Sequence, residues 1–369
     1  MGNWAELPED LLVLTAKRIA LFEDFLSFSG VCRSWRSVAI NDHFRGSEQI
    51  PWLMLSEKDK PDERQFVSLR KGGVIRKINL PEARGKRCLE SLGWFVTISE
   101  DGDMSLLHPF TRAKINLPHV TTFKYYDLDS LEYICSKKDC MKNHHGFIQK
   151  AVLSSCPKES NDYVLVVIYT GCGILAFWRP GDKSWTDVEA GITSFSDVIF
   201  HKGLFYGVIR GGMVFAFDPW GSNPTRPWLV LLRGPRMGGT AYIVKSAGVV
   251  LMIFPKYEST VIDYEEVDYW VCGFKVFECI LGETWVCVDK TSLGDNALFL
   301  GDNASISVDA SRFPVIKANC IYFTDNFKRR GGSYCMGIYD MEDGSLMRCY
   351  EGESSSLIFP PTWVNPSSF

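Results

Sequence analysis

The chain has 369 residues, of which 46% are hydrophobic and 23% are charged. These proportions are ordinary for a folded globular protein and exclude a disordered chain. The 40 Lys and Arg residues against 44 Asp and Glu residues leave a net charge of −4, so overall charge indicates no nucleic-acid partner. No apolar run approaches the roughly 20 residues that span a bilayer, and we expect no membrane partner.

The cysteines and the start of the chain bear on the compartment. The 12 cysteines include no CxxC pair, and the start MGNWAELPEDLL lacks the basic and apolar regions of a secretory signal. We therefore expect reduced thiols in a protein of the nucleus, the cytoplasm or both. The glycosylation sequon NAS at Asn303 has no meaning without a secretory route.

Residues 1–45 have the pattern of helices. In LPEDLLVLTAKRIALF the apolar residues recur three or four positions apart, and Pro8 suits a first helical turn. FEDFLSF predicts a second helix. After Gly30, the apolar residues recur with the period of a third, amphipathic helix, at Val31, Trp35 and Val38.

From about residue 50 the pattern changes to short apolar runs of the kind found in strands. These runs are rich in Val, Ile and aromatic residues and are separated by Gly, Asp, Asn and Pro, which indicates an all-β region. A loose repeat of strand, polar turn and strand recurs at 105–117, 175–188, 214–231, 275–288 and 337–349. A second segment, at 198–209, resembles 315–326, since each has an apolar start, a polar turn and then an aromatic strand. Degenerate four-stranded units of this size predict a β-propeller of about six, or seven, blades.

A propeller needs its ring closed, and the two ends of the β region can do this. PWLML at 51–55 is the first strand candidate and LIFPPTWV at 357–364 contains the last. We expect these two segments to pair.

The N-terminal segment resembles an F-box. The pattern of that family is matched in order by LPEDLL, FEDFLSF and GVCRSWRSVA, over residues 4–44. Thr15, Lys17 and Gly30 depart mildly from it. The remainder is similar to plant F-box proteins whose C-terminal region was catalogued as a domain of unknown function and is expected to be a kelch-like propeller. The segments that carry this similarity are 298–326, 337–346 and 359–366.

The resemblance implies an F-box domain at 1–45 and a substrate-recognition propeller at 46–369. It implies docking to a Skp-type adaptor and, through it, to the cullin and RING subunits of an SCF ubiquitin ligase. The propeller would hold a protein substrate for ubiquitination, and the chain itself would not be an enzyme. One alternative is a scaffold or co-regulator that acts without the ligase. Another is an enzyme on a propeller scaffold, which would need a convergent polar cluster in the central channel.

The helical segment is too small to bury its own apolar faces, so part of that surface needs a partner. By the resemblance, we expect eight residues to contact the adaptor or the core directly behind that contact: Leu7, Pro8, Leu11, Leu12, Ile19, Val31, Cys32 and Trp35. Trp35 would be a large desolvated anchor of the interface. The alternative is that Trp35 packs the helices on one another, and the two roles can coexist.

Other clusters favour structural over chemical roles. Cys135, Cys140, His144 and His145 have spacings near those of zinc sites, but a second cysteine pair is missing, so we predict a solvated insertion and no metal site. The acidic run at 261–270 fits a hairpin or strand edge better than catalysis, and a recognition loop is a further alternative. The ten Lys and Arg residues at 58–87 indicate a solvated strand and turn rather than a phosphate site. No catalytic or cofactor motif is present.

Overall fold

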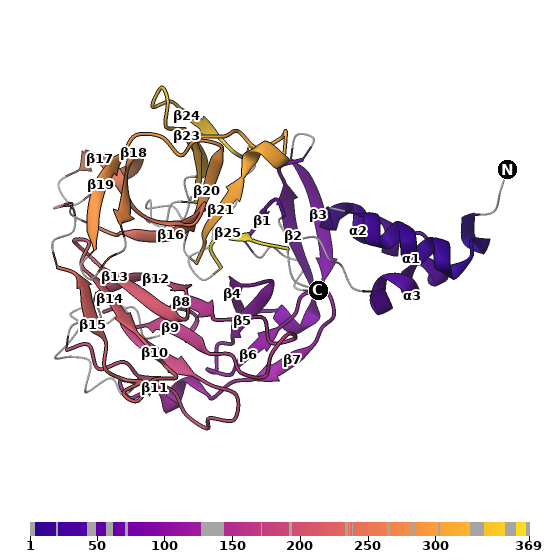
Figure 1. Cartoon of the computed structure of the whole chain (residues 1–369), viewed down its shortest axis with the longest axis horizontal. Helices are drawn as coiled ribbons and strands as arrows, with labels where there is room; N and C mark the ends of the chain where they lie inside the picture. The colour runs from indigo at the N-terminus through magenta and orange to yellow at the C-terminus, as the bar shows by residue number, and fades with distance from the viewer. Residues whose placement is uncertain are drawn as a thin grey trace.

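The computed structural model describes residues 4–19, 21–42, 49–56, 62–70, 73–126, 144–170, 172–191, 194–232, 235, 237, 239–263, 266–280, 282, 285–301, 303–324, 336–350 and 359–366. Three N-terminal helices are followed by six β-sheets arranged as a ring, with the helices at the side of the ring (Figure 1). In this described part of the chain, no helix is long and apolar enough to cross a membrane.

The N-terminal module has a short 3-10 helix and three α-helices: η1 (Trp4–Glu6), α1 (Glu9–Arg18), α2 (Phe22–Ser29) and α3 (Arg33–Asp42). The three predicted helices are confirmed, but α3 begins at Arg33, so the prediction that Val31 lies on its apolar face is wrong. Pro8 occupies the N-cap of α1 rather than its first turn. Glu9 and Asp10 lie in that first turn and Lys17 and Arg18 in the last, and in these places their charges interact favourably with the helix dipole. The predicted boundary after residue 45 falls among residues 43–48, outside the described residues.

Blades 2 to 5 follow one pattern, in which four consecutive antiparallel strands run from the channel to the outer rim. Blade 2 contains β4 (Arg87–Ser91), β5 (Trp94–Ile98), β6 (Met104–Leu107) and β7 (Lys114–Asn116). Blade 3 contains β8 (Ile148–Leu153), β9 (Leu165–Tyr169), β10 (Ile174–Trp178) and β11 (Thr186–Asp187). Blade 4 contains β12 (Phe195–His201), β13 (Leu204–Ile209), β14 (Val214–Phe217) and β15 (Trp228–Leu231). Blade 5 contains β16 (Tyr242–Ser246), β17 (Val249–Asp263), β18 (Glu266–Ile280) and β19 (Val286–Lys290).

Blade 1 closes the ring by joining the last strand of the chain to the first three. From the channel outward its strands are β25 (Thr362–Val364), β1 (Trp52–Met54), β2 (Glu63–Ser68) and β3 (Val74–Asn79). β25 is antiparallel to β1, with Leu53 opposite Trp363. The predicted pairing of the two ends of the β region is therefore confirmed.

Blade 6 departs from the four-stranded pattern. Its strands are β20 (Asn296–Leu300), β21 (Ser305–Asp309), β22 (Cys320–Thr324), β23 (Met336–Asp340) and β24 (Leu346–Arg348). They form one sheet in the order β21-β20-β22-β23-β24, and β20 and β22 are parallel. The prediction of four strands per blade is wrong here, because this sheet has five strands. The chain first forms β20, the second strand from the channel, and then turns back to form the innermost strand, β21. The unusual segment 298–326 encodes this arrangement.

The sequence repeats correspond to particular hairpins. All five copies of the first repeat contain the two outermost strands of a blade: β6–β7, β10–β11, β14–β15, β18–β19 and β23–β24. The prediction that 198–209 and 315–326 are repeats is wrong. The first segment is the hairpin β12–β13, whereas the second passes through a loop into β22. The blade number is six rather than seven.

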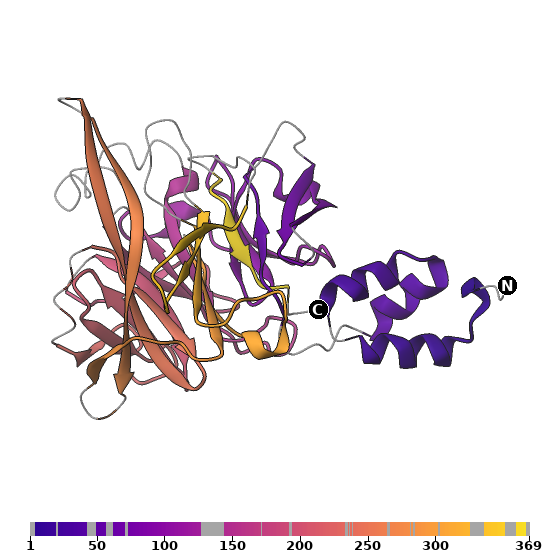
Figure 2. The ribbon, with the colours of Figure 1, turned by 90° about the horizontal axis from the view of Figure 1, so that it is seen from above.

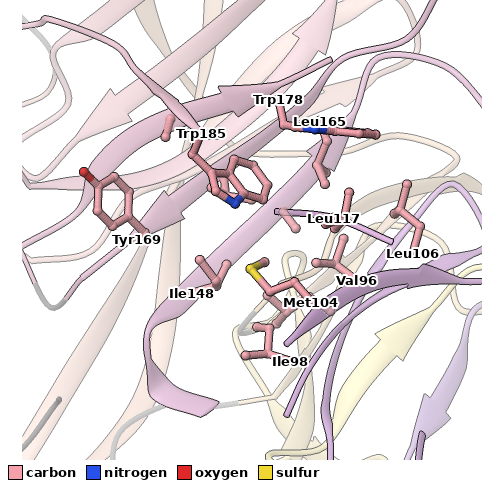
Figure 3. Close-up of a cluster of buried hydrophobic side chains, with 14 of the residues drawn as sticks. Val96, Ile98, Met104, Leu106, Leu117, Ile148, Leu165, Tyr169, Trp178 and Trp185 are labelled. Atoms are coloured by element: carbon pink, nitrogen blue, oxygen red, sulfur yellow. The ribbon is translucent and has the colours of Figure 1, made fainter. Parts of the chain in front are cut away.

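The propeller core lies between blades, which explains the continuous apolar runs of the sequence. Side chains alternate across a strand, so successive residues of β9 face opposite sides of blade 3. Leu165 and Val167 pack toward blade 2, and Val166 and Ile168 pack toward blade 4. Figure 3 shows the first of these clusters, in which Trp178 and Trp185 of blade 3 lie over Leu106 and other residues of blade 2.

Candidate functional site

Helix α1 carries apolar side chains on two sides. Leu12 and Ala16 are buried at 1% and 5% exposure, whereas Leu11 and Leu14 are 49% and 52% exposed. The buried pair forms the core of the helical module with residues of α2 and α3. The exposed pair faces solvent on a helix whose other side is already packed. Large apolar side chains in that situation mark a surface for a partner.

The eight residues predicted at this surface separate into three groups. Leu12 is buried. Four are partly buried: Leu7, Ile19, Cys32 and Trp35. Three are exposed: Pro8, Leu11 and Val31. The exposed three are available for direct contact with a partner, while the other five shape the helices behind them.

Trp35 is used inside the helical module. Its ring centroid lies 4.6 Å from that of Phe28, and its indole Nε1 donates a hydrogen bond to the carbonyl oxygen of Trp4 at 3.0 Å. These contacts support the alternative role of Trp35, which is to pack the helices on one another. Nearby, the Ser34 hydroxyl lies 3.0 Å from the Cys32 sulfur, and this hydrogen bond lowers the pKa of the Cys32 thiol.

Two further exposed apolar residues of the helical module were missed by the sequence reasoning. Trp4 is 71% exposed and Leu14 is 52% exposed. Leu14 has a periodic signal, because it lies three residues after Leu11 and seven after Leu7 and so shares a second face of α1. Trp4 has no such signal, since its position depends on the hydrogen bond from Trp35.

The helical module docks on the propeller through the N-terminus of α2. The Phe22 ring lies 5.7 Å from the ring of Trp52 in blade 1 and 4.6 Å from that of Phe110 in blade 2. The Phe22 backbone N–H donates to Gln49 Oε1 at 2.7 Å. Helix residues and residues of blades 1 and 2 therefore belong to one buried cluster. Part of the apolar surface that we expected to need a partner is covered by the propeller itself.

The same contact explains part of the basic run at 58–87. Arg70 lies 2.9 Å from Asp24, and Arg76 lies 3.6 Å from the nearly buried Glu23. The Arg76 guanidinium is also 5.9 Å from the ring centroid of Trp52. These arginines come from the β2–β3 hairpin and its turn, which agrees with the predicted strand and turn, and they neutralise acidic residues at the start of α2.

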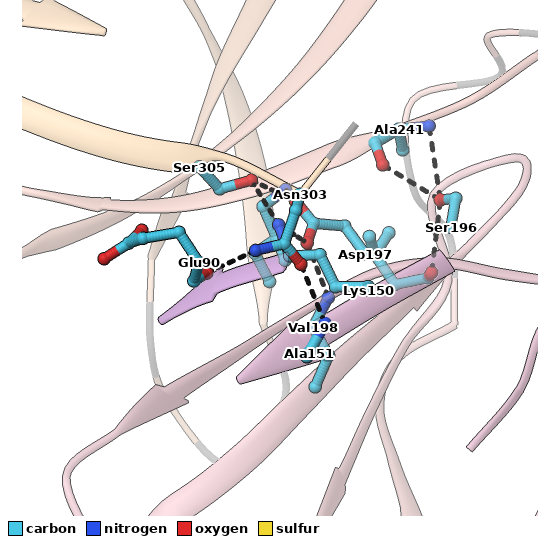
Figure 4. Close-up of polar contacts among 11 residues, drawn as sticks. Glu90, Lys150, Ala151, Ser196, Asp197, Val198, Ala241, Asn303 and Ser305 are labelled. Atoms are coloured by element: carbon cyan, nitrogen blue, oxygen red, sulfur yellow. Dashed lines mark hydrogen bonds and ion pairs between the residues drawn. The ribbon is translucent and has the colours of Figure 1, made fainter. Parts of the chain in front are cut away.

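A buried polar network crosses the centre of the propeller (Figure 4). Lys150 on β8 lies 2.6 Å from Asp197 on β12, and the Ser305 hydroxyl donates to Asp197 at 2.6 Å. Asp197 also accepts the backbone N–H of Ile243 on β16. Four blades therefore meet at one carboxylate. No sequence motif marks these residues, because they lie far apart along the chain and meet only in the closed ring.

Asn303 extends the network to blade 2. Its carbonyl oxygen accepts the N–H of Ala151 at 2.8 Å, and its amide donates to the carbonyl oxygen of Glu90. Asn303 is only 4% exposed, so the sequon side chain is used inside the fold. The Glu90 carboxylate accepts the N–H of Gly93 at 2.8 Å, and burial raises its pKa to about 7. Apart from the bond between Gly93 and Glu90 within blade 2, the polar contacts named here join different blades, which indicates a structural clamp.

The zinc prediction concerns residues that are only partly described. Cys135 and Cys140 lie outside the described residues. Both ring nitrogens of His144 are within hydrogen-bond distance of protein oxygens, at 2.8 Å from Tyr126 Oη and 2.6 Å from the Glu100 carbonyl. These contacts give His144 a role in attaching the start of blade 3 to blade 2.

The acidic run at 261–270 lies at the far end of a long hairpin. β17 and β18 pair from Val250 opposite Cys279 to Asp263 opposite Glu266. The hairpin interpretation of this run is therefore confirmed for the backbone. Figure 2 shows the hairpin rising out of the propeller disc at the end remote from the helices. Among the described strands, β17 and β18 reach furthest from the ring (Figure 2).

Comparison with known proteins gives relatives over the full length. The chain is 26% identical to "F-box protein SKIP23" of Arabidopsis thaliana, with 99% of this chain and 96% of that protein covered. It is 26% identical to "Putative F-box protein At5g55150" of the same plant, with 99% and 98% covered. It is 24% identical to "F-box protein At2g17036", with 100% and 96% covered. The plant F-box resemblance is thus supported, and the helices lie within the matched span.

A family description matches the propeller. Residues 66–340 match the family described as KIB1-4 beta-propeller, a span from β2 to β23. That description does not call the propeller kelch-like, so this part of the resemblance stays a prediction. Six blades, ring closure and the matched span agree, and the chain belongs to the KIB1-4 β-propeller family.

Proposed function

We propose that the chain is the substrate-recognition subunit of an SCF-type ubiquitin ligase. In this proposal residues 4–42 bind a Skp-type adaptor, which connects the chain to cullin and RING subunits, and the propeller binds a protein substrate. The chain performs no catalysis and works by holding the substrate at high effective concentration near the transfer site. We place it in the nucleus, the cytoplasm or both.

The observation that carries the proposal is the exposed apolar surface of the helices. Leu11 and Leu14 are 49% and 52% exposed, although the opposite side of α1 is packed, and Val31, between α2 and α3, is 52% exposed. Large apolar side chains that stay exposed on a folded module favour a protein partner. The similarity to plant F-box proteins over 99% of the chain supports a Skp-type adaptor as that partner.

The attachment of the helices to the propeller supports the second half of the proposal. Phe22 lies between Trp52 and Phe110, so the module has a defined orientation on blades 1 and 2. A substrate bound by the propeller would then be presented in a fixed direction relative to the adaptor. The β17–β18 hairpin projects away from the helices and offers one element for substrate contact (Figure 2).

The test is adaptor binding by the purified full-length chain. We expect Leu11→Ala combined with Leu14→Ala to weaken binding to a recombinant Skp-type adaptor about tenfold or more, because central apolar contacts dominate such interfaces. The matched control is Leu346→Ala with Met347→Ala, two similarly exposed residues on β24, at 43% and 42%. Equal binding by both double variants and the unchanged chain would reject the proposed surface.

A second measurement separates the ligase role from the scaffold alternative. Cullin should be recovered together with the adaptor when the chain is isolated from cells. Recovery of the adaptor without cullin would favour a scaffold or co-regulator that acts outside the ligase.

A further inference from the structure

Cys279 and Cys287 face one another on adjacent strands of blade 5. They are register partners of β18 and β19, and their sulfur atoms are 3.3 Å apart. Residues directly opposite in an antiparallel pair have Cα atoms about 4.5 to 5.5 Å apart. A disulfide spans Cα separations of about 4.4 to 6.8 Å. The backbone therefore already meets the geometric requirement for a bond between these two thiols.

The surroundings of the pair hold the two strands in register. Lys290 of β19 lies 2.7 Å from Glu278 of β18, and Lys275 lies 3.4 Å from Asp289. The N–H of Trp285 donates to the carbonyl oxygen of Val230 at 2.9 Å, which attaches the start of β19 to blade 4. The sulfur atoms are thus kept opposite one another by contacts on both sides of the pair.

The two thiols differ in access and in acidity. Cys279 is 2% exposed and packs in the core between blades 4 and 5. Cys287 lies on the outermost strand and is only partly buried. The hydrogen bond between them lowers the pKa of Cys287 and, together with burial, raises that of Cys279. This asymmetry matches an accessible attacking thiol with a resolving thiol behind it.

We propose that Cys279 and Cys287 form a reversible disulfide when the protein meets a peroxide. The Cys287 thiolate attacks one oxygen of hydrogen peroxide, the O–O bond breaks, and a sulfenic acid and hydroxide are formed; the hydroxide takes up the proton that Cys287 released on ionising and becomes water. The Cys279 sulfur then attacks the Cys287 sulfur, the S–O bond breaks, and the Cys279 proton leaves in a second water. The two thiols lose two electrons in total, and the peroxide gains them.

The disulfide would fasten the outer edge strand of blade 5. β19 carries Val286 and Val288, which are 56% and 49% exposed, so it is an apolar edge that the bond would hold on β18. Reduction by a thiol would release it. This chemistry is independent of adaptor binding and goes beyond the proposed function.

The test uses the reduced full-length chain and hydrogen peroxide in equal molar amount, followed by alkylation of free thiols. Residues 276–290 contain no Lys or Arg before Lys290, so both cysteines lie in one tryptic peptide. We expect this peptide to escape alkylation and to be lighter than the reduced form by two hydrogens. Cleavage after Glu283 should leave its two halves joined until a reductant is added.

Two variants complete the test. In Cys279→Ser we expect Cys287 to stop at the sulfenic acid, which dimedone traps. Cys272→Ser is the matched control, because Cys272 lies on the same strand and its thiol instead donates to the Lys256 carbonyl at 3.4 Å. It should form the disulfide as the unchanged chain does. Alkylation of both Cys279 and Cys287 in the peroxide-treated unchanged chain would overturn the proposal.

Discussion

The ring of Phe22, at the start of α2, packs edge-on against the ring of Phe110 in blade 2, with centroids 4.6 Å apart. One side chain of the helical module is thereby inserted between blades 1 and 2. The helices and the propeller share a buried cluster at this point, although their sequence patterns are unrelated. The relative orientation of the two parts depends on this contact.

Phe22→Ala should loosen the helices from the propeller. Replacing a buried Phe by Ala removes apolar contact and leaves a cavity, at a cost of about 3 kcal/mol. We expect faster protease cleavage between residues 42 and 52, measured by the appearance of the free propeller fragment. Leu346→Ala, at an exposed residue of β24, should leave the cleavage rate unchanged. An unchanged rate in Phe22→Ala would show that the contact does not hold the module.

Trp35 variants distinguish packing from partner contact. Trp35→Phe loses the hydrogen bond to the Trp4 carbonyl and should cost the helical module about 1 kcal/mol. Trp35→Ala also loses the contact with Phe28 and should cost about 3 kcal/mol. Hydrogen exchange of amides in α1 and α3 measures both effects. Full protection in Trp35→Ala together with lost adaptor binding would assign Trp35 to the interface instead.

The central ion pair predicts a large effect of removing one charge. Lys150→Met leaves Asp197, which is 1% exposed, without its partner, and should lower the free energy of unfolding by about 3 kcal/mol or more. Adding Asp197→Asn removes the stranded charge and should restore part of this loss. Lys275→Met, at the exposed pair with Asp289, should change stability by about 0.5 kcal/mol or less. Denaturant unfolding of the three variants and the unchanged chain measures these differences.

Glu90 predicts a loss of stability as pH rises. Burial raises its pKa from 4.5 to about 7 in the folded chain, so the folded state holds this proton after the unfolded state has released it. The stabilisation from the protonated Glu90 is fully present below pH 4.5 and declines between pH 4.5 and 7. The total loss of unfolding free energy over this range is about 3 kcal/mol. The comparison is unfolding free energy at pH 5 and pH 8. Glu90→Gln should reduce the difference, and an identical difference in that variant would contradict the assignment.

The helices, the strand-rich region and the ring closure could be predicted because their signals are local. Apolar periodicity in α1 and α3 and continuous apolar runs such as that of β9 reflect which faces are buried. The five outer hairpins repeat because each blade presents the same surface to its neighbours. The strand order of blade 6 could not be predicted in this way. The second strand from the channel, β20, precedes the innermost strand, β21, in the sequence, and the order depends on the parallel pairing of β20 with β22.

The candidate surface could be predicted in part. The spacing of apolar residues selected Leu11 and Val31, both of which are exposed, although Val31 precedes α3 instead of lying on it. It could not separate them from Leu12, because adjacent positions of one helix differ only in which neighbour covers them. The position of Trp4 depends on a hydrogen bond to Trp35, 31 residues away.

The amino-acid sequence by itself determined that N-terminal helices are followed by a strand-rich region of six or seven repeating units, because these features follow from local periodicity and turn residues. Only the tertiary structure decided which polar groups meet in the channel. Lys150 and Ser305 are 155 residues apart, and Asn303 is 213 residues from Glu90. Their contacts exist because closing the ring brings the innermost strands together around one axis. The local sequence pattern cannot predict such contacts between distant residues.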